Sequence, residues 1–370
     1  MRRHARRILF FAVILALQFG VFEVALRTWG SSEAAPSFQG LFASDATIGY
    51  RLKPGARVRF TTSEFDTQIA VNDAGVRDND EIGPKVAGER RVVILGDSLV
   101  LSVQVPFEQT FGELLEQRLN ASLLPGASGP QVRYRVINAG VQGYGPVEEL
   151  LFFRSVVRQL EPDVVLATLF VGNDAEEAVT SAPKLSARRA AADVLRDSVV
   201  TRLRRAVRRS MVLQILRLRF VSATARLRDV NGPPEPPLQS YAAVPATRIA
   251  RGLDITRQSI AAIAADAAAQ GARTGIVLMP ARFQIDTPDY LRLRDAVAQA
   301  GGELQRDAAT DRFTAALAPL ALPVTDLLVP LRAAPSGSDL FFQANVHLTP
   351  RGHHVVADHL APFVARVLER

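Results

Sequence analysis

The stretch Arg91-Val92-Val93-Ile94-Leu95-Gly96-Asp97-Ser98 decides the fold of this 370-residue chain. A short strand pattern runs into a Gly-Asp-Ser turn, and a helical pattern follows from about Pro106. A strand, a tight turn and a helix in this order place Ser98 at the carboxyl end of a strand, where open α/β sheets bind their ligands. Gly-Asp-Ser is also an ordinary turn composition, so its meaning depends on what else reaches that edge.

The sequence after this stretch keeps alternating strand and helix patterns, which is typical of a parallel α/β sheet. The last helix is expected to begin at Thr349 as N-cap with Pro350 in its first turn, and to bury Val356, Leu360, Phe363, Val364 and Val367. The remaining elements are predicted as strands at 132–137, 164–171, 274–279 and 323–327, and as helices at 106–120, 147–160, 256–270, 289–300 and 303–317.

Three successive strands end in polar loops that contain glycine: Gly96-Asp97-Ser98, Gln142-Gly143 and Gly172-Asn173-Asp174. In a parallel sheet these loops share one edge. That edge then collects a hydroxyl nucleophile, a free backbone amide and a side-chain amide. These groups are what is needed to attack an acyl carbon and to stabilise its oxyanion.

A histidine base for Ser98 has few candidates, because the chain holds five histidines. His4 lies in the basic N-terminal segment, and three others fall inside the final helix pattern, where they are expected to pack or to face solvent: His353, His354 and His359. His347 precedes that helix in a loop, so its side chain can point into a site. Histidine is the usual general base for serine because its pKa lies near neutrality.

Composition excludes several other classes. The absence of cysteine rules out disulfides, cysteine-ligated zinc and thiol nucleophiles. The net charge is +7, but Lys184 to Asp229 holds thirteen Lys and Arg against three Asp, so the rest of the chain is net −3. That distribution argues against a general nucleic-acid-binding protein. No G-x-G-x-x-G follows the first strand, which argues against a dinucleotide enzyme.

The N-terminus has the pattern of a membrane anchor. A basic cluster at residues 1–7 precedes an uncharged run from Ile8 to Phe22, and the apolar pattern continues past Glu23 to Leu26. Nineteen residues approach the ~20 that span a bilayer. We expect a cytoplasmic basic tail at 1–7 and a transmembrane helix at 8–28, with the rest of the chain outside. A cleaved signal peptide and a buried core helix are the alternatives.

Residues 29–90 are predicted to be a linker followed by a small β-rich lead-in. Residues 31–37 are small, polar and proline-containing, as linkers are. Segments 49–55 and 56–60 are expected to form short strands about a turn, and 64–72 another strand. Nothing in this region forms a chemical constellation.

An arginine-rich segment at 183–250 is expected to be a helical insertion that ends in the proline-rich run 232–237. Three interpretations are open. The segment is interpreted as a solvated helical pair packed over the domain, as a basic face that rests on anionic lipid, or as a nucleic-acid site. The last is disfavoured because few aromatic residues lie between the basic ones.

With these residues identified, the chain resembles the SGNH (GDSL-like) hydrolase superfamily over residues 91–370. The resemblance implies a flavodoxin-like three-layer α/β/α fold and a serine esterase or acyltransferase that needs no metal or cofactor. It also implies that Ser98 is the nucleophile and His347 the base, with an oxyanion hole formed by Ser98 N–H, Gly143 N–H and the Asn173 side chain. The anchor and lead-in resemble a bacterial inner-membrane subgroup whose catalytic domain is periplasmic.

One position departs from that family's pattern. Members usually carry an Asp two or three residues before the histidine, and here those positions are Asn345 and Ala344. In a serine protease, replacing the equivalent Asp by Asn costs roughly 10⁴ in rate. Asn345 can orient the ring through its amide oxygen, Asp339 can substitute from nearby, or the pair can work as a dyad.

The predicted function is therefore a membrane-anchored esterase or O-acyltransferase that removes or moves short acyl groups on an envelope glycan or lipid. The alternative is a catalytically weak or inactive envelope protein that keeps the fold as a glycan-binding or scaffold module. A third reading is a lipid-surface effector that uses the arginine-rich segment.

Overall fold

The structure, a computed structural model, describes residues 38, 40–121, 132–181, 238–335 and 337–369, together with Gln18 and Gly20. All but these last two residues belong to one compact unit. The predicted anchor, apart from Gln18 and Gly20, and the arginine-rich segment up to residue 237 lie outside the described residues. Within the described residues, no helix combines the length and the apolar character that a bilayer span requires.

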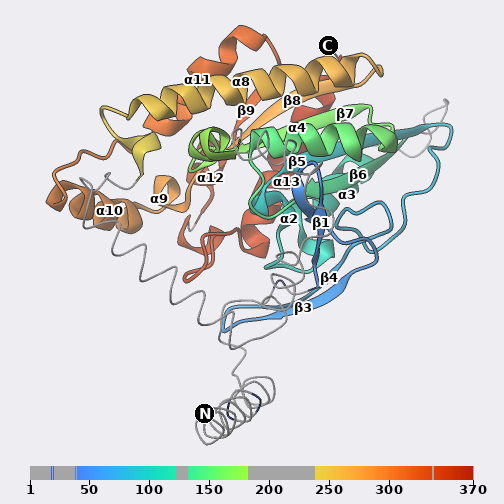
Figure 1. Cartoon of the computed structure of the whole chain (residues 1–370), viewed down its shortest axis with the longest axis horizontal. Coiled ribbons are helices and arrows are strands. Elements are labelled where there is room, and N and C mark those ends of the chain that lie inside the picture. The colour runs from blue at the N-terminus through green and yellow to red at the C-terminus, as the bar shows by residue number, and fades with distance from the viewer. Residues whose placement is uncertain are drawn as a thin grey trace, which may run out of the picture. The chain divides into compact units, whose positions relative to one another are not determined.

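A five-stranded parallel sheet forms the centre of the unit (Figure 1). Its order is β6-β5-β7-β8-β9, which by position along the chain is 2-1-3-4-5, the flavodoxin-like order. Val92 of β5 is in register with Val136 on one side and Val164 on the other. The predicted α/β class with a parallel sheet is confirmed. The strands are β5 Glu89–Gly96, β6 Arg133–Gly140, β7 Val164–Phe170, β8 Arg273–Met279 and β9 Val324–Asp326.

Helices cover both faces of this sheet (Figure 1). Val93 and Val165 face a core shared with α4, α8 and α11, while Val92 and Val164 face a core shared with α3, α12 and α13. Successive strand residues point to opposite faces, which is why neighbours along one strand enter different cores. The helices are α3 Phe111–Ala121, α4 Pro146–Ser155, α8 Thr247–Ala268, α11 Ala308–Leu317, α12 Leu328–Ala333 and α13 Pro350–Glu369.

Several helices differ from the predicted ones. Helix α8 begins at Thr247 rather than at the predicted Thr256. Its Gly252 is normally unfavourable in a helix, but here it lets α8 pack against the backbone of Ala175. A Cβ added at Gly252 would lie 1.7 Å from the Ala175 carbonyl oxygen. The predicted helix at 303–317 begins only at Ala308. The remaining helices are α10 Thr287–Gln299 and the four-residue α2 Ser98–Leu101 and α9 Arg282–Ile285, with 3₁₀ turns η1 Phe107–Gln109, η2 Val157–Leu160, η3 Gln239–Tyr241, η4 Ala318–Leu320 and η5 Gly337–Leu340.

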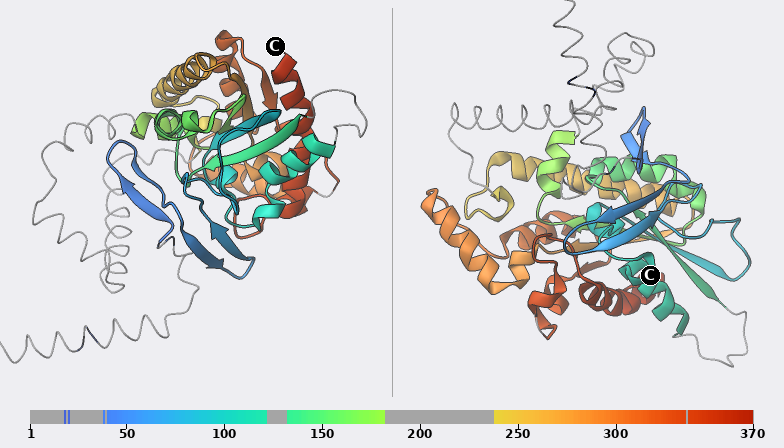
Figure 2. Two further views of the ribbon diagram at one scale, coloured as in Figure 1. Left: turned by 90° about the vertical axis from the view of Figure 1, so that its right-hand side faces the viewer. Right: turned by 90° about the horizontal axis from the view of Figure 1, so that it is seen from below.

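The lead-in forms two antiparallel hairpins, drawn in blue in Figure 2. Strand β1 (Phe42–Asp45) pairs with β2 (Gly49–Leu52), and β3 (Arg57–Thr61) pairs with β4 (Asp66–Ala70). The predicted short strands at 49–55 and 56–60 are present as β2 and β3, on either side of a turn, but each pairs with a different neighbour. The Asp45 carboxylate accepts the N–H groups of Thr47 and Ile48 at 2.8 and 2.9 Å, and so stabilises a turn that joins β1 to β2.

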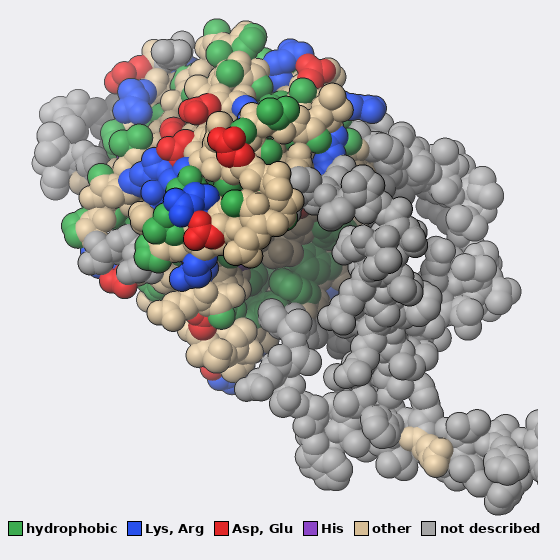
Figure 3. All heavy atoms as spheres, turned by 90° about the vertical axis from the view of Figure 1, so that its left-hand side faces the viewer, with side chains coloured by type: hydrophobic (Ala, Val, Ile, Leu, Met, Phe, Trp, Pro, Cys, Tyr) green, Lys and Arg blue, Asp and Glu red, His purple; other side chains and the backbone are tan. Residues whose placement is uncertain are grey.

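The described surface carries charges of both signs. Figure 3 shows Lys and Arg interspersed with Asp and Glu on one face. Ion pairs such as Lys85–Asp163 and Arg154–Asp266, each at 2.6 Å, are examples of this mixture. Pairs of this kind contribute only about 0–1 kcal/mol each when exposed, so the stability of the unit rests mainly on the two apolar cores.

Gly140, at the end of β6, lies directly against the backbone of the Ser98 helix. A Cβ at this position would lie 2.3 Å from the Leu101 nitrogen and 2.7 Å from the Val100 carbonyl carbon. Both atoms are backbone, so they cannot move aside without displacing α2.

We therefore expect Gly140→Ala to lower the free energy of unfolding by about 2–3 kcal/mol through overpacking. Urea denaturation measures this change. The matched variant is Gly83→Ala, because nothing lies within 4 Å of a Cβ built at Gly83. The free energy of unfolding of that control should change by less than about 0.5 kcal/mol. If Gly140→Ala lowered it by no more than Gly83→Ala does, α2 would be able to move aside and the prediction would be wrong.

Candidate active site

Ser98 is the first residue of α2, directly after β5. The Asp97 carboxylate caps this helix by accepting the Leu99 N–H at 2.8 Å, and Ser102 ends it in a left-handed conformation with φ 55°. The four-residue helix was not predicted, because so short an element shows no periodicity. It leaves Ser98 half-buried at the carboxyl edge of the sheet.

His347 lies in a tight loop before α13. The Phe342 N–H donates to the His347 carbonyl oxygen at 3.0 Å and closes the loop. The ring nitrogen Nε2 is 2.8 Å from Ser98 Oγ, while Nδ1 contacts Asn345 Oδ1. The structure therefore brings together three of the residues that the sequence analysis selected, from segments 249 positions apart.

The orientation of the Asn345 amide follows from a second contact. The backbone N–H of His347 donates to Asn345 Oδ1 at 3.2 Å, and a backbone N–H can only donate, so the amide oxygen faces the histidine. The ring must then carry its proton on Nδ1, which leaves the Nε2 lone pair facing the Ser98 hydroxyl. Burial lowers the pKa of His347 to about 4, so the ring is neutral at physiological pH.

Asp339, the other predicted orienting residue, is engaged elsewhere. Its carboxylate is 3.5 Å from the Arg351 guanidinium, and its carbonyl oxygen accepts the Thr349 hydroxyl at 2.5 Å. The contact with His347 Nδ1 comes instead from Asn345.

Gly143 and Asn173 follow β6 and β7, the two strands that flank β5, so their loops leave the sheet on either side of Ser98. Gly143 has φ +70°, a conformation that favours glycine, and a Cβ there would lie 3.0 Å from the Tyr50 hydroxyl. Asn173 Nδ2 donates one N–H to Glu177 Oε1 at 2.8 Å, and its second N–H is a further donor.

A cluster of buried carboxyl groups adjoins the Ser98 turn. Asp97, Glu149 and Asp174 are at most 5% exposed. Burial raises the pKa of Asp97 to about 6, and burial together with mutual repulsion raises the pKa values of Glu149 and Asp174 well above their usual range. The sequence analysis missed Glu149, because an acidic residue in the first turn of a helix normally faces solvent.

A raised carboxyl pKa destabilises the fold at high pH. Above about pH 4.3 the unfolded chain loses the Glu149 proton while the folded chain keeps it, so stability falls with pH up to the folded-state pKa. We expect Glu149→Gln to reduce the loss of unfolding free energy between about pH 5 and pH 8 by about 1 kcal/mol or more. Urea titrations at both pH values test this. The exposed Glu161→Gln variant serves as the control, and a Glu149→Gln profile identical to it would contradict the expectation.

The lead-in supports the site from outside, which the sequence analysis did not anticipate. The buried Arg77 guanidinium donates to the carbonyl oxygens of Leu101, the last residue of α2, and of Val105, in the segment that follows, each at 2.7 Å. The Tyr50 hydroxyl donates to the Gln142 carbonyl oxygen at 2.7 Å, next to Gly143. These contacts join residues far apart in sequence, so no local pattern signals them.

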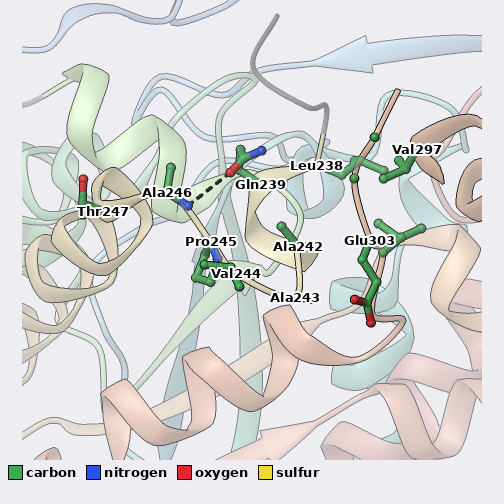
Figure 4. Close-up of a pocket in the computed structure, with 13 residues that line it drawn as sticks. Leu238, Gln239, Ala242, Ala243, Val244, Pro245, Ala246, Thr247, Val297 and Glu303 are labelled. Carbon is green, nitrogen blue, oxygen red and sulfur yellow. Dashed lines mark hydrogen bonds between the residues drawn. The ribbon is translucent and has the colours of Figure 1, made fainter. Parts of the chain in front are cut away.

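A cavity of about 600 Å³ lies beside η3 (Figure 4). Leu238, Val297 and Leu304 are among its lining residues, and the Gln239 side chain on its wall accepts the Ala246 N–H at 3.1 Å. Its described lining contains none of the residues that the sequence analysis selected, so we assign it no part in the chemistry.

Residues 241–369 match a family model described as the SGNH hydrolase-like domain of acetyltransferase AlgX. The matched part contains His347 and Asn345, and ends before the C-terminal residue. No curated protein sequence matches the chain.

Among solved structures, the chain is similar to TesA, with 14% identity and a TM-score of 0.41 over 75% of this chain and 99% of that one. It is also similar to esterase EstA from Pseudoalteromonas sp., with 15% identity and a TM-score of 0.40 over 76% and 100% of the two chains. A two-domain esterase active on acetylated mannans shows 11% identity and a TM-score of 0.40 over 77% and 51%.

Proposed function

We propose that this chain, whose residues 241–369 match a model of an SGNH hydrolase-like domain, is a serine esterase or O-acyltransferase acting on acyl esters of an envelope glycan or lipid. One observation carries the proposal. A neutral imidazole, fixed by Asn345, presents its free nitrogen 2.8 Å from the Ser98 hydroxyl. Nucleophile and base within hydrogen-bond reach, with the base oriented by a third group, are the arrangement of nucleophilic catalysis.

In the proposed reaction, Ser98 Oγ attacks the acyl carbon while its proton passes to His347 Nε2. The negative charge that develops on the carbonyl oxygen is stabilised by the N–H groups of Ser98 and Gly143 and by Asn173 Nδ2. The tetrahedral intermediate then releases the alcohol, which takes the proton from His347. Water attacks acyl-Ser98 in an esterase, and a second hydroxyl attacks it in a transferase.

Asn345 sets how fast this cycle runs. Its amide oxygen selects the productive tautomer, as an Asp does, but it carries no negative charge to stabilise the imidazolium that forms during attack. The proposed enzyme therefore has a correctly oriented base of reduced strength.

The substrate class and location belong to the same proposal. The family model's description as an acetyltransferase favours a short acyl group. The basic N-terminus followed by an apolar run favours an inner-membrane anchor with the catalytic domain on the periplasmic side.

The first test uses the full chain and a fluorophosphonate probe, which modifies activated serines. We expect the wild type to be labelled and Ser98→Ala to lose at least about 99% of the labelling, since the acceptor oxygen is gone. Ser155→Ala, on α4, should label like the wild type. A folded wild-type protein that never labels would favour the non-catalytic scaffold reading.

The second test replaces Asn345 by Asp. A carboxylate beside Nδ1 stabilises the imidazolium, so p-nitrophenyl acetate hydrolysis should rise by about 10-fold or more, within the roughly 10⁴ known for such pairs. The neutral ring is the base, so activity rises with pH through the His347 pKa. That limb should lie near pH 4 in the wild type and move upward in the variant. An unchanged rate and profile would reject Asn345 as the limiting group.

A further inference from the structure

An arginine side chain holds the backbone carbonyl groups at the start of the His347 loop. Arg282, on α9, donates from Nη1 to the carbonyl oxygens of Phe342 and Gln343 at 2.9 and 2.7 Å. The Asp289 carboxylate pairs with Arg282 and keeps its guanidinium in place. A cation is thus fixed against two carbonyl oxygens of the loop.

The amide side of the same segment is held by an acid from the lead-in. Glu64 Oε1 accepts the N–H groups of Gln343 and Ala344 at 2.7 and 3.0 Å. Ala344 directly precedes Asn345, the residue that contacts the His347 ring. Charge-assisted bonds of this kind are shorter and stronger than those between neutral groups.

Glu64 is itself fixed in a tight turn between β3 and β4. The Thr62 N–H donates to the Phe65 carbonyl oxygen at 2.8 Å, and the Thr62 hydroxyl oxygen accepts the N–H groups of Glu64 and Phe65, each at 3.1 Å. The Phe65 ring packs on that of Phe342, with centroids 5.6 Å apart. The β3–β4 hairpin therefore holds the Glu64 carboxylate in a fixed position beside the His347 loop.

We propose that Glu64 is a positioning residue that sets the approach of His347 to Ser98, which makes the lead-in a working part of the active site. The inference rests on the proposed function, in which those two side chains react. Without the carboxylate, the N–H groups of Gln343 and Ala344 lose their partner, while the Arg282 bonds, the Phe65 contact and the Phe342–His347 bond remain. A displacement of about 1 Å at a reacting group can cost about 100-fold in rate.

The kinetic experiment compares three variants of the full chain. Glu64→Ala should lower kcat for p-nitrophenyl acetate by about 10- to 100-fold, with KM changed by less than about twofold, because substrate contacts remain. Glu64→Gln should recover most of the loss, since its amide oxygen can still accept both N–H groups. Glu81→Ala is the matched control: Glu81 is also a lead-in carboxylate on a backbone amide, accepting the Asp73 N–H at 2.9 Å, but away from the loop.

A second readout does not need activity. NMR titration of the His347 ring should give a pKa near 4 in the wild type and in Glu81→Ala, and a higher value in Glu64→Ala, because a loosened loop exposes the ring. If the wild type neither labels nor hydrolyses, the proposed function fails while this titration still tests Glu64. A Glu64→Ala protein with an unchanged His347 titration overturns the inference, whatever its kcat.

Discussion

Hydrogen bonding of β5 along both of its edges is the constraint on which the site depends. Because β6 and β7 pair with it in parallel, the loops after all three strands leave the sheet together. The stretch Val92–Leu95 of β5, enclosed by neighbouring strands and by helices on both faces, is apolar and buried. The polar residues of this segment lie at the two ends of β5: Glu89 to Arg91 at its start, and Asp97 and Ser98 just beyond its last residue.

The sheet supplies the serine and its flanking amides, but it does not fix the histidine. That residue arrives from the far end of the chain, in a loop whose geometry is set by neighbours outside the sheet. The lead-in contacts all three parts of the site: Arg77 holds the end of α2, Tyr50 the loop before Gly143, and Glu64 the loop before His347. An appendage that looked chemically empty in the sequence is thus built into the site.

The central strands and the edge that gathers Ser98 follow from local periodicity and sheet topology. His347 followed from elimination, because the other four histidines lie in the basic N-terminal segment or in the final helix pattern. What could not be predicted depends on distant neighbours. Glu64 and Gln343 are 279 positions apart, and Gly252 disfavours a helix until α8 packs against Ala175. The pairing of the lead-in strands could not be predicted either, because nothing local distinguishes β1 from β3 as the partner of β2. Catalytic roles for Ser98, Gly143, Asn173 and His347 stay predictions.

The order in which these parts leave the ribosome has a consequence of its own. The lead-in and Ser98 are synthesised before the loop with His347 and helix α13, whose His353 ring accepts the Phe111 N–H at 3.1 Å. Domains are made from the N-terminus onward. A nascent chain that has not yet reached residue 347 therefore holds Ser98 without the imidazole that contacts its hydroxyl.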